Sequence, residues 1–182
     1  MSVLERIFLV TDALFPAKRP RWELEKIRQN IEFLIPEMKT LAVVAPRHSY
    51  LRRMRPLPPH TQVLDIEWPA ANTPASAEEI GRDQSIDTLL IDISASDAAQ
   101  LLEDMSANGT LSCLKVVVTP VAFQERYAGK PYYAAVTALV GRHGYSLFNL
   151  YNVAWKRGQI RTAYALYIDR KLRGDFVRKI QV

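Results

Sequence analysis

Two aspartates stand where short apolar runs give way to polar residues, and both could take part in chemistry. Asp12 follows the apolar segment 6–11, and Asp92 lies near the end of the segment 86–93. A carboxylate at the carboxyl end of a strand in an open α/β sheet can accept hydrogen bonds from a cofactor, bind a metal or act as a general base. The same residue types also suit structure, because Asp12 can close a turn and Asp92 can introduce the helix that follows it.

A basic segment with one aromatic residue and no acid covers residues 47–55. Its arginines are Arg47, Arg52, Arg53 and Arg55. Guanidinium groups form paired hydrogen bonds with carboxylates and phosphates, so the segment could bind an acidic protein surface or an anionic saccharide. The absence of a nucleic-acid-binding motif and the nearby prolines argue against nucleic acid. A solvated basic surface is the plain alternative.

Other reactive residue types form no recognisable pattern. The three histidines, His48, His60 and His143, have no Cys or His at a metal-ligand spacing, so no metal site is predicted. His143 suits the C-terminal end of a helix, where a histidine interacts with the helix dipole. The single cysteine, Cys113, lies in the apolar run 111–118, which predicts a buried side chain. No Gly-x-Ser-x-Gly turn indicates a serine nucleophile.

The elements that must position these residues alternate between short apolar runs and amphipathic stretches. Strands are predicted at residues 6–11, 40–45, 61–66, 86–93, 114–119, 145–152 and 162–169. Helices are predicted at residues 21–35, 77–82, 131–142 and from a cap at Ser94 or Ser96 to residue 107. A polar turn at residues 156–159 favours antiparallel pairing of the last two strands. The expected fold is a single α/β domain over residues 1–182, Rossmann-like, with a mostly parallel sheet and an antiparallel C-terminal hairpin strand.

The charge distribution predicts a surface suited to anionic partners. The chain has 182 residues and a net charge of +5, and residues 17–56 hold ten Lys or Arg against four Glu. No run approaches the ~20 apolar residues of a membrane span, and the N-terminus lacks the apolar core of a secretion signal. These features predict a soluble, cytoplasmic protein without a membrane span.

In the C-terminal half, residues 86–97 read Ile-Asp-Thr-Leu-Leu-Ile-Asp-Ile-Ser-Ala-Ser-Asp. This segment resembles one in the FkbM family of S-adenosylmethionine-dependent methyltransferases, in which an acid, an apolar pair, Lys-Ile-Asp-Val-Glu-Gly, a small residue and Glu follow in that order. Residues 123–129, 131–144, 145–152 and 165–168 are similar to the later family pattern of a Tyr-x-Gly loop, a helix ending in Gly-aromatic, and two strands. The match covers residues 74–171.

The resemblance implies a methyltransferase fold and an S-adenosylmethionine site, but the sequence departs from the family at functional positions. The turn at residues 11–18 has no glycine, and Ala45 stands where the family has the acid that binds the ribose. Leu90 replaces a lysine, and Ser94 with Ala95 replaces Glu-Gly, whereas Asp92 is retained. Glycine lets backbone N–H groups approach a cofactor closely, so its loss argues against the usual cofactor binding.

Two functions follow from the resemblance and its departures. The first is a noncatalytic accessory or binding protein, acting beside an active homologue, with no bound cofactor expected. The alternative is an active S-adenosylmethionine-dependent O-methyltransferase acting on a sugar or other hydroxyl. Its cofactor site would be formed around Asp12, Ala45 and Asp92, with Asp92 as the candidate catalytic residue. In either case an exposed final strand could pair between subunits of a homo-oligomer.

Overall fold

The computed structural model describes residues 21–47, 49, 60–68, 80, 86–123 and 133–174. The predicted strand at residues 6–11 lies outside the described residues, as does the predicted helix at 77–82 apart from the buried Ile80. Asp12 and three of the four arginines of the basic segment, Arg52, Arg53 and Arg55, also lie outside them.

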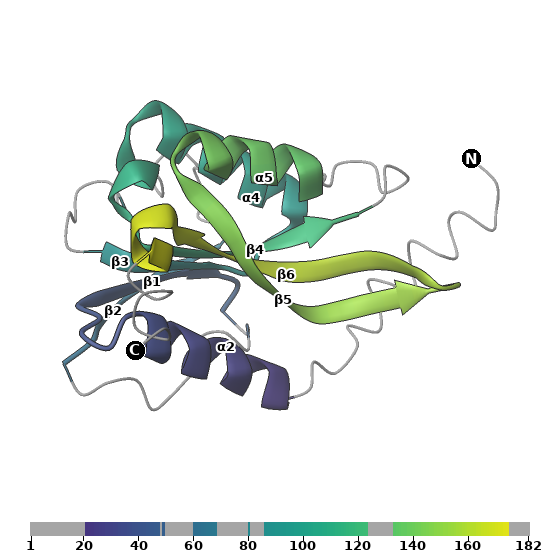
Figure 1. Ribbon diagram of the computed structural model, residues 1–182, viewed down its shortest axis with the longest axis horizontal. Coiled ribbons are helices and arrows are strands. Elements are labelled where there is room, and N and C mark those ends of the chain that lie inside the picture. The colour runs from purple at the N-terminus through teal and green to yellow at the C-terminus, as the bar shows by residue number, and fades with distance from the viewer. Residues whose placement is uncertain are drawn as a thin grey trace.

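Within the described residues, six strands form one sheet in the order β2-β1-β3-β4-β6-β5 (Figure 1). They are β1 (Thr40–Ala45), β2 (Gln62–Glu67), β3 (Ile86–Ile91), β4 (Val116–Ala122), β5 (Tyr145–Lys156) and β6 (Gln159–Asp169). The pairings among β1 to β4 are parallel, whereas β6 is antiparallel to both β4 and β5. The predicted Rossmann-like α/β class, with a mostly parallel sheet and an antiparallel C-terminal hairpin, is therefore confirmed.

Helices cover both faces of the sheet (Figure 1). Helix α2 (Arg21–Leu34) lies on one face, and α4 (Ala95–Ala107) and α5 (Tyr133–Arg142) lie on the other. A short 3-10 turn, η2 (Thr110–Cys113), follows α4. Each face has its own hydrophobic core, with Leu102 and Tyr167 buried on the α4–α5 side and Ile27 and Leu166 buried on the α2 side. Because both faces are covered, the central strands β1 and β3 are buried along their whole length.

Helix α4 begins where its local sequence predicts, and the β5–β6 hairpin turns where its sequence predicts. Ser94 caps α4, since its hydroxyl oxygen accepts a hydrogen bond from the Asp97 N–H at 3.2 Å. The hairpin turns at Arg157 and Gly158, whose φ angles are 52° and 74°. Positive φ at both positions is the geometry that a two-residue hairpin turn requires, and glycine adopts it without strain.

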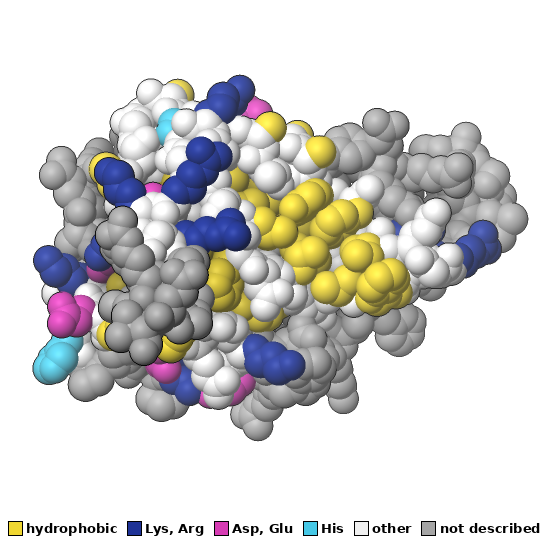
Figure 2. Space-filling view, in the orientation of Figure 1, with side chains coloured by type: hydrophobic (Ala, Val, Ile, Leu, Met, Phe, Trp, Pro, Cys, Tyr) yellow, Lys and Arg dark blue, Asp and Glu magenta, His cyan; other side chains and the backbone are white. Residues whose placement is uncertain are grey.

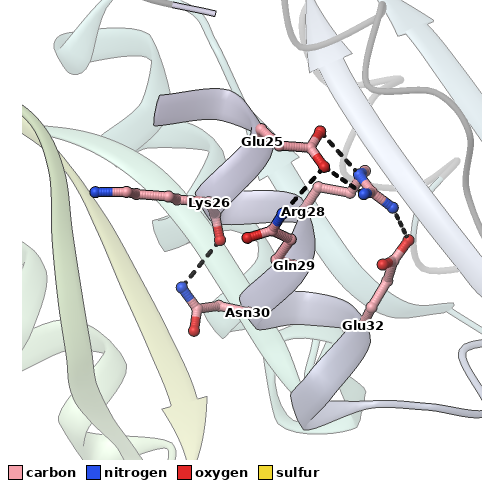
Figure 3. Close-up of polar contacts among 6 residues, drawn as sticks. All are labelled: Glu25, Lys26, Arg28, Gln29, Asn30 and Glu32. Atoms are coloured by element: carbon pink, nitrogen blue, oxygen red, sulfur yellow. Dashed lines mark hydrogen bonds and ion pairs between the residues drawn. The ribbon is translucent and has the colours of Figure 1, made fainter. Parts of the chain in front are cut away.

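Ion pairs within the helix line one side of α2 (Figure 3). The Arg28 guanidinium pairs with Glu25 one turn before it and with Glu32 one turn after it. The hydrogen bond from Arg28 lowers the pKa of Glu25, and the same bond raises the pKa of Arg28. Such pairs at spacings of three and four residues stabilise a helix by a few tenths of a kcal/mol each, about 0.2–0.5.

Two features around β4 differ from the sequence-based expectation. Cys113 is exposed rather than buried, because η2 occupies the start of the apolar run and gives the core positions to Leu111 and Leu114. Strand β4 also continues past Thr119 through Pro120. Its ladder with β3 ends at Val118, so the N–H that proline lacks is not needed for that pairing.

Candidate functional site

The order of the strands identifies the part of the sheet that can form a site. Strand β1 pairs with β2 on one side and with β3 on the other. The chain therefore runs from β1 outward to β2 and then crosses back past β1 to β3. In open α/β sheets, ligands bind outside the carboxyl ends of the strands at the point where the strand order reverses. Here that switch point lies just after Ala45 and Ile91.

Asp92 occupies the switch point as the first residue after β3. Its N–H donates to the Val44 carbonyl at 2.8 Å, which continues the β1–β3 ladder by one bond. Asp92 is only 9% exposed, and hydroxyl groups from other parts of the chain donate to both of its carboxylate oxygens. The Ser49 hydroxyl donates to Oδ2, and the Tyr164 hydroxyl, from β6, donates to Oδ1. A buried carboxylate needs such partners, and here the protein supplies them itself.

A tight turn after β1 brings Ser49 to this carboxylate. The Ser49 N–H donates to the Pro46 carbonyl at 2.9 Å, which closes a turn over residues 46–49. Ser49 is buried, whereas Arg47 is exposed. A dinucleotide-binding sheet has its glycine-rich turn after the strand at the switch point, and the described strand order gives that place to residues 46–49 rather than to residues 11–18, where the resemblance put it. In this chain the turn contains a proline, which has no N–H to offer, and no glycine.

The adjacent strand end carries an acid that the sequence analysis did not single out. Glu67 is the last residue of β2, is exposed, and pairs in register with Ala45. An acid at this place, roughly 20 residues beyond the first turn, binds ribose hydroxyls in dinucleotide-binding sheets. Trp68 follows it and joins three elements, since its N–H donates to the Ala45 carbonyl at 3.1 Å and its indole Nε1 donates to Asp97 Oδ2 at 3.3 Å.

The structure brings only some of the predicted site residues to the switch point as polar groups. Asp92 lies at the switch point, and the exposed Arg47 lies in the turn beside it. Ala45 ends β1 with a fully buried methyl group in the α2-side core, so it contributes no polar atom. Ser49 and Tyr164 were not predicted. Tyr164 reaches Asp92 because β6 runs antiparallel beside β4, a register that a single sequence does not reveal.

His143 takes part in a second polar cluster, away from the strand ends. Its Nε2 lies 2.6 Å from the Ser106 hydroxyl of α4, and its Nδ1 lies 2.9 Å from the Ser112 hydroxyl of η2. The imidazole therefore joins the end of α5 to α4 and η2. Within the described residues, no three His, Cys, Asp or Glu side chains gather as a set of metal ligands. Nor is any described helix long and apolar enough to cross a membrane.

Comparison with known proteins gives similarities of fold. No family model and no curated protein matches the sequence. Among solved structures, the chain is similar to a release-factor-specific protein-(glutamine-N5) methyltransferase from Alicyclobacillus acidocaldarius, with 15% identity, a TM-score of 0.47 and coverage of 82% of this chain and 94% of that one. The N-terminal domain of EvdMO1, crystallised with SAH and D-fucose, has 10% identity, a TM-score of 0.49 and coverage of 93% and 98%. Magnesium protoporphyrin IX methyltransferase from Synechocystis PCC 6803, with bound SAM, has 12% identity, a TM-score of 0.46 and coverage of 85% and 84%.

Proposed function

We propose that this chain is a methyltransferase-like protein that does not bind S-adenosylmethionine in the usual way and acts as a noncatalytic accessory or binding protein. The observation that carries the proposal is the state of Asp92. Both oxygens of this switch-point carboxylate accept hydrogen bonds from the chain's own hydroxyls, Ser49 and Tyr164. A ligand would have to displace these bonds before it could use the carboxylate.

The turn after β1 supports the same conclusion. A cofactor held at a switch point is approached by backbone N–H groups of a glycine-rich turn. Here the Ser49 N–H already donates to the Pro46 carbonyl, and Pro46 has no N–H of its own. The residues present therefore do not fit the usual cofactor.

The partner we propose is acidic, either a protein surface or an anionic saccharide. Arg47 is exposed in the turn at the switch point, and the sequence places Arg52, Arg53 and Arg55 within eight residues of it. A partner bound at this edge would occupy the place where a ligand binds in related sheets. Guanidinium groups suit carboxylates, sulfates and phosphates in such a position.

One observation favours a second candidate function, the active O-methyltransferase acting on a sugar or other hydroxyl. Glu67 presents an exposed carboxylate at the end of β2, beside the switch point. Such an acid can accept hydrogen bonds from ribose hydroxyls. In this reading Glu67, rather than the buried Ala45, would hold the ribose of S-adenosylmethionine.

Calorimetric titration with S-adenosylmethionine and S-adenosylhomocysteine separates the two functions. The proposal predicts no binding up to about 1 mM ligand, which corresponds to a binding free energy weaker than about −4 kcal/mol. The double variant Ser49→Ala, Tyr164→Phe removes both hydroxyl bonds to Asp92 and serves as the companion. Gain of binding in this variant alone would show that the two hydroxyls close the site.

A micromolar affinity of the unmodified chain would overturn the proposal. The active candidate then predicts that Glu67→Gln weakens binding at least tenfold, because a carboxylate that accepts two hydroxyl bonds is replaced by a neutral amide. Asp65→Asn is the matched control, since Asp65 is also exposed on β2 but lies two residues before the strand end. It should leave the affinity unchanged.

A further inference from the structure

Strand β5 forms one edge of the described sheet, because it pairs with β6 on one side and with no described strand on the other. Residues 145–155 of this strand include no charged side chain. The strand at the other edge, β2, exposes Asp65 and Glu67. Charges on an edge strand discourage further pairing, whereas a long uncharged edge favours it. The outer edge of β5 is therefore the better acceptor of an added strand.

Apolar side chains flank this edge on both faces of the sheet. Leu147, Leu150 and Val153 are partly buried against the core on the α4–α5 side, and Phe148 is partly buried against the core on the α2 side. Trp155, near the end of the strand, is 65% exposed. Figure 2 shows a hydrophobic patch where Figure 1 draws β5. An added strand with apolar side chains on both faces would extend both cores.

Basic residues lie at both ends of the uncharged stretch. Arg142 ends α5 just before β5, and the Arg170 N–H donates at 3.0 Å to the carbonyl of the glycine that precedes β5. Both arginines are exposed, as are Lys156 and Arg157 at the other end of the stretch. The nearby Asp169 offsets only part of this charge. Figure 2 shows Lys and Arg side chains on both sides of the hydrophobic patch.

This distribution of charge disfavours a second copy of the chain as the occupant of the edge. In a symmetric antiparallel pairing of two β5 strands, the end of each strand lies next to the start of the other. Lys156 and Arg157 of one copy would then approach Arg142 and Arg170 of the other, and like charges repel. An extended segment of a different protein fits better if its centre is apolar and both of its ends are acidic.

We propose that the outer edge of β5 binds such an acidic-ended segment of a partner protein as an added strand of the sheet. Backbone hydrogen bonds along the edge supply affinity, and the basic residues at its two ends select the partner. The inference goes beyond the proposed function. Strands β4 and β6 lie between this edge and β3, so binding here depends neither on S-adenosylmethionine nor on the basic segment.

A synthetic peptide tests the proposal. It alternates Val and Thr over the length of the uncharged stretch and carries two Glu at each end. Fluorescence anisotropy with the full chain should give a dissociation constant of about 10–100 μM. The matched peptide has the same centre with two Lys at each end, and it should bind at least tenfold more weakly. Saturation with the Glu-ended peptide should slow hydrogen exchange of the outward-facing β5 amides at least tenfold and leave β2 unchanged.

Charge reversal on the protein tests the two ends of the edge. Arg142→Glu and Arg157→Asp should each weaken binding of the Glu-ended peptide at least threefold, and the double variant should prefer the Lys-ended peptide. Aspartate is used at position 157 because the φ of 52° there suits Asp better than Glu. Lys39→Glu is the matched control, since Lys39 is exposed just before β1, and it should change the affinity less than twofold.

Three results would overturn the proposal. The first is no binding of the Glu-ended peptide up to about 1 mM, and the second is equal binding of the two peptides. The third is slow exchange of the outward-facing β5 amides without any peptide. Slow exchange that persists on dilution would show that another part of this chain covers the edge, and slow exchange that is lost on dilution would assign the edge to a second copy.

Discussion

The hydroxyl of Tyr164 donates to Oδ1 of Asp92 across 72 residues of chain. Tyr164 lies on β6, opposite Pro120 of β4, and Asp92 follows the parallel strand β3. The antiparallel C-terminal hairpin therefore supplies one of the two hydroxyls that donate hydrogen bonds to the carboxylate at the switch point. The other, from Ser49, comes from the turn after β1. The site thus depends on segments from the first, middle and last parts of the described chain.

Replacing Tyr164 with Phe should destabilise the fold. The variant keeps the ring but leaves Oδ1 of a buried carboxylate without this hydrogen bond. Hydrogen bonds to charged groups contribute about 1.5–3 kcal/mol, so we expect the free energy of unfolding to fall by about 2 kcal/mol. Urea unfolding measures the change. Tyr133→Phe is the control, since no hydrogen bond of its hydroxyl is found among the described residues; a loss equal to that control would contradict the proposed role of Tyr164.

Asp87 lies at the start of β3, at the other end of the strand from Asp92. Replacing it should lower the free energy of unfolding more than replacing its ion-pair partner, Lys115. Asp87 is 6% exposed and accepts a hydrogen bond from the Lys39 N–H at 2.7 Å, whereas the side chain of Lys115 is 46% exposed. Asp87→Ala leaves a backbone N–H without its acceptor and should lower the free energy of unfolding by about 1–3 kcal/mol. Lys115→Ala removes the ion pair but keeps the bond from the Lys39 N–H, and water can replace a lysine side chain that is 46% exposed, so it should cost less than about 1 kcal/mol. Equal losses in thermal or urea unfolding would show that the ion pair itself dominates.

Much of the sheet could be predicted from the sequence because its strands are short and apolar on both faces. The predicted strand at residues 40–45 coincides with β1, and the hairpin turn falls at Gly158 as expected. Strand ends were less accurate in β5, which runs four residues beyond the predicted end to Lys156. Residues 153–156 are mostly exposed and their ladder with β6 is irregular, so no regular alternation of buried and exposed side chains marks where the strand ends.

The site was predicted only in part. Asp92 was recognisable because an acid interrupts the end of an apolar run. Ser49 and Tyr164 were not, because the first depends on a turn closed by one backbone bond and the second on a pairing between distant strands. Glu67 could have been found by asking which acid ends the strand beside β1, but that question needs the order of the strands.

The free energy of unfolding should fall at high pH through two buried tyrosines. Burial raises the pKa of Tyr167 to about 12 and raises that of Tyr145 further, whereas a tyrosine in the unfolded chain has a pKa of about 10. Their contribution to the free energy of unfolding is therefore complete below about pH 10 and is lost as the pH rises through 12. Over that range each group lowers the free energy of unfolding by about 1.4 kcal/mol per pH unit. Tyr167→Phe should reduce that slope by one group's share in unfolding experiments between pH 10 and 12. A slope unchanged by the substitution would show that Tyr167 ionises equally well in the folded chain.

The basic segment should bind anions more strongly than another basic surface of equal charge. A sulfated oligosaccharide is a suitable probe, and its affinity should fall as salt rises, because salt screens the attraction between guanidinium and sulfate groups. The triple variant Arg52→Gln, Arg53→Gln, Arg55→Gln should weaken binding at least tenfold. The control removes three charges elsewhere, at the exposed residues Arg170, Lys171 and Arg173, and should weaken it less than threefold. Because both variants lower the net charge equally, equal losses would mean that overall charge, rather than the basic segment, attracts the ligand.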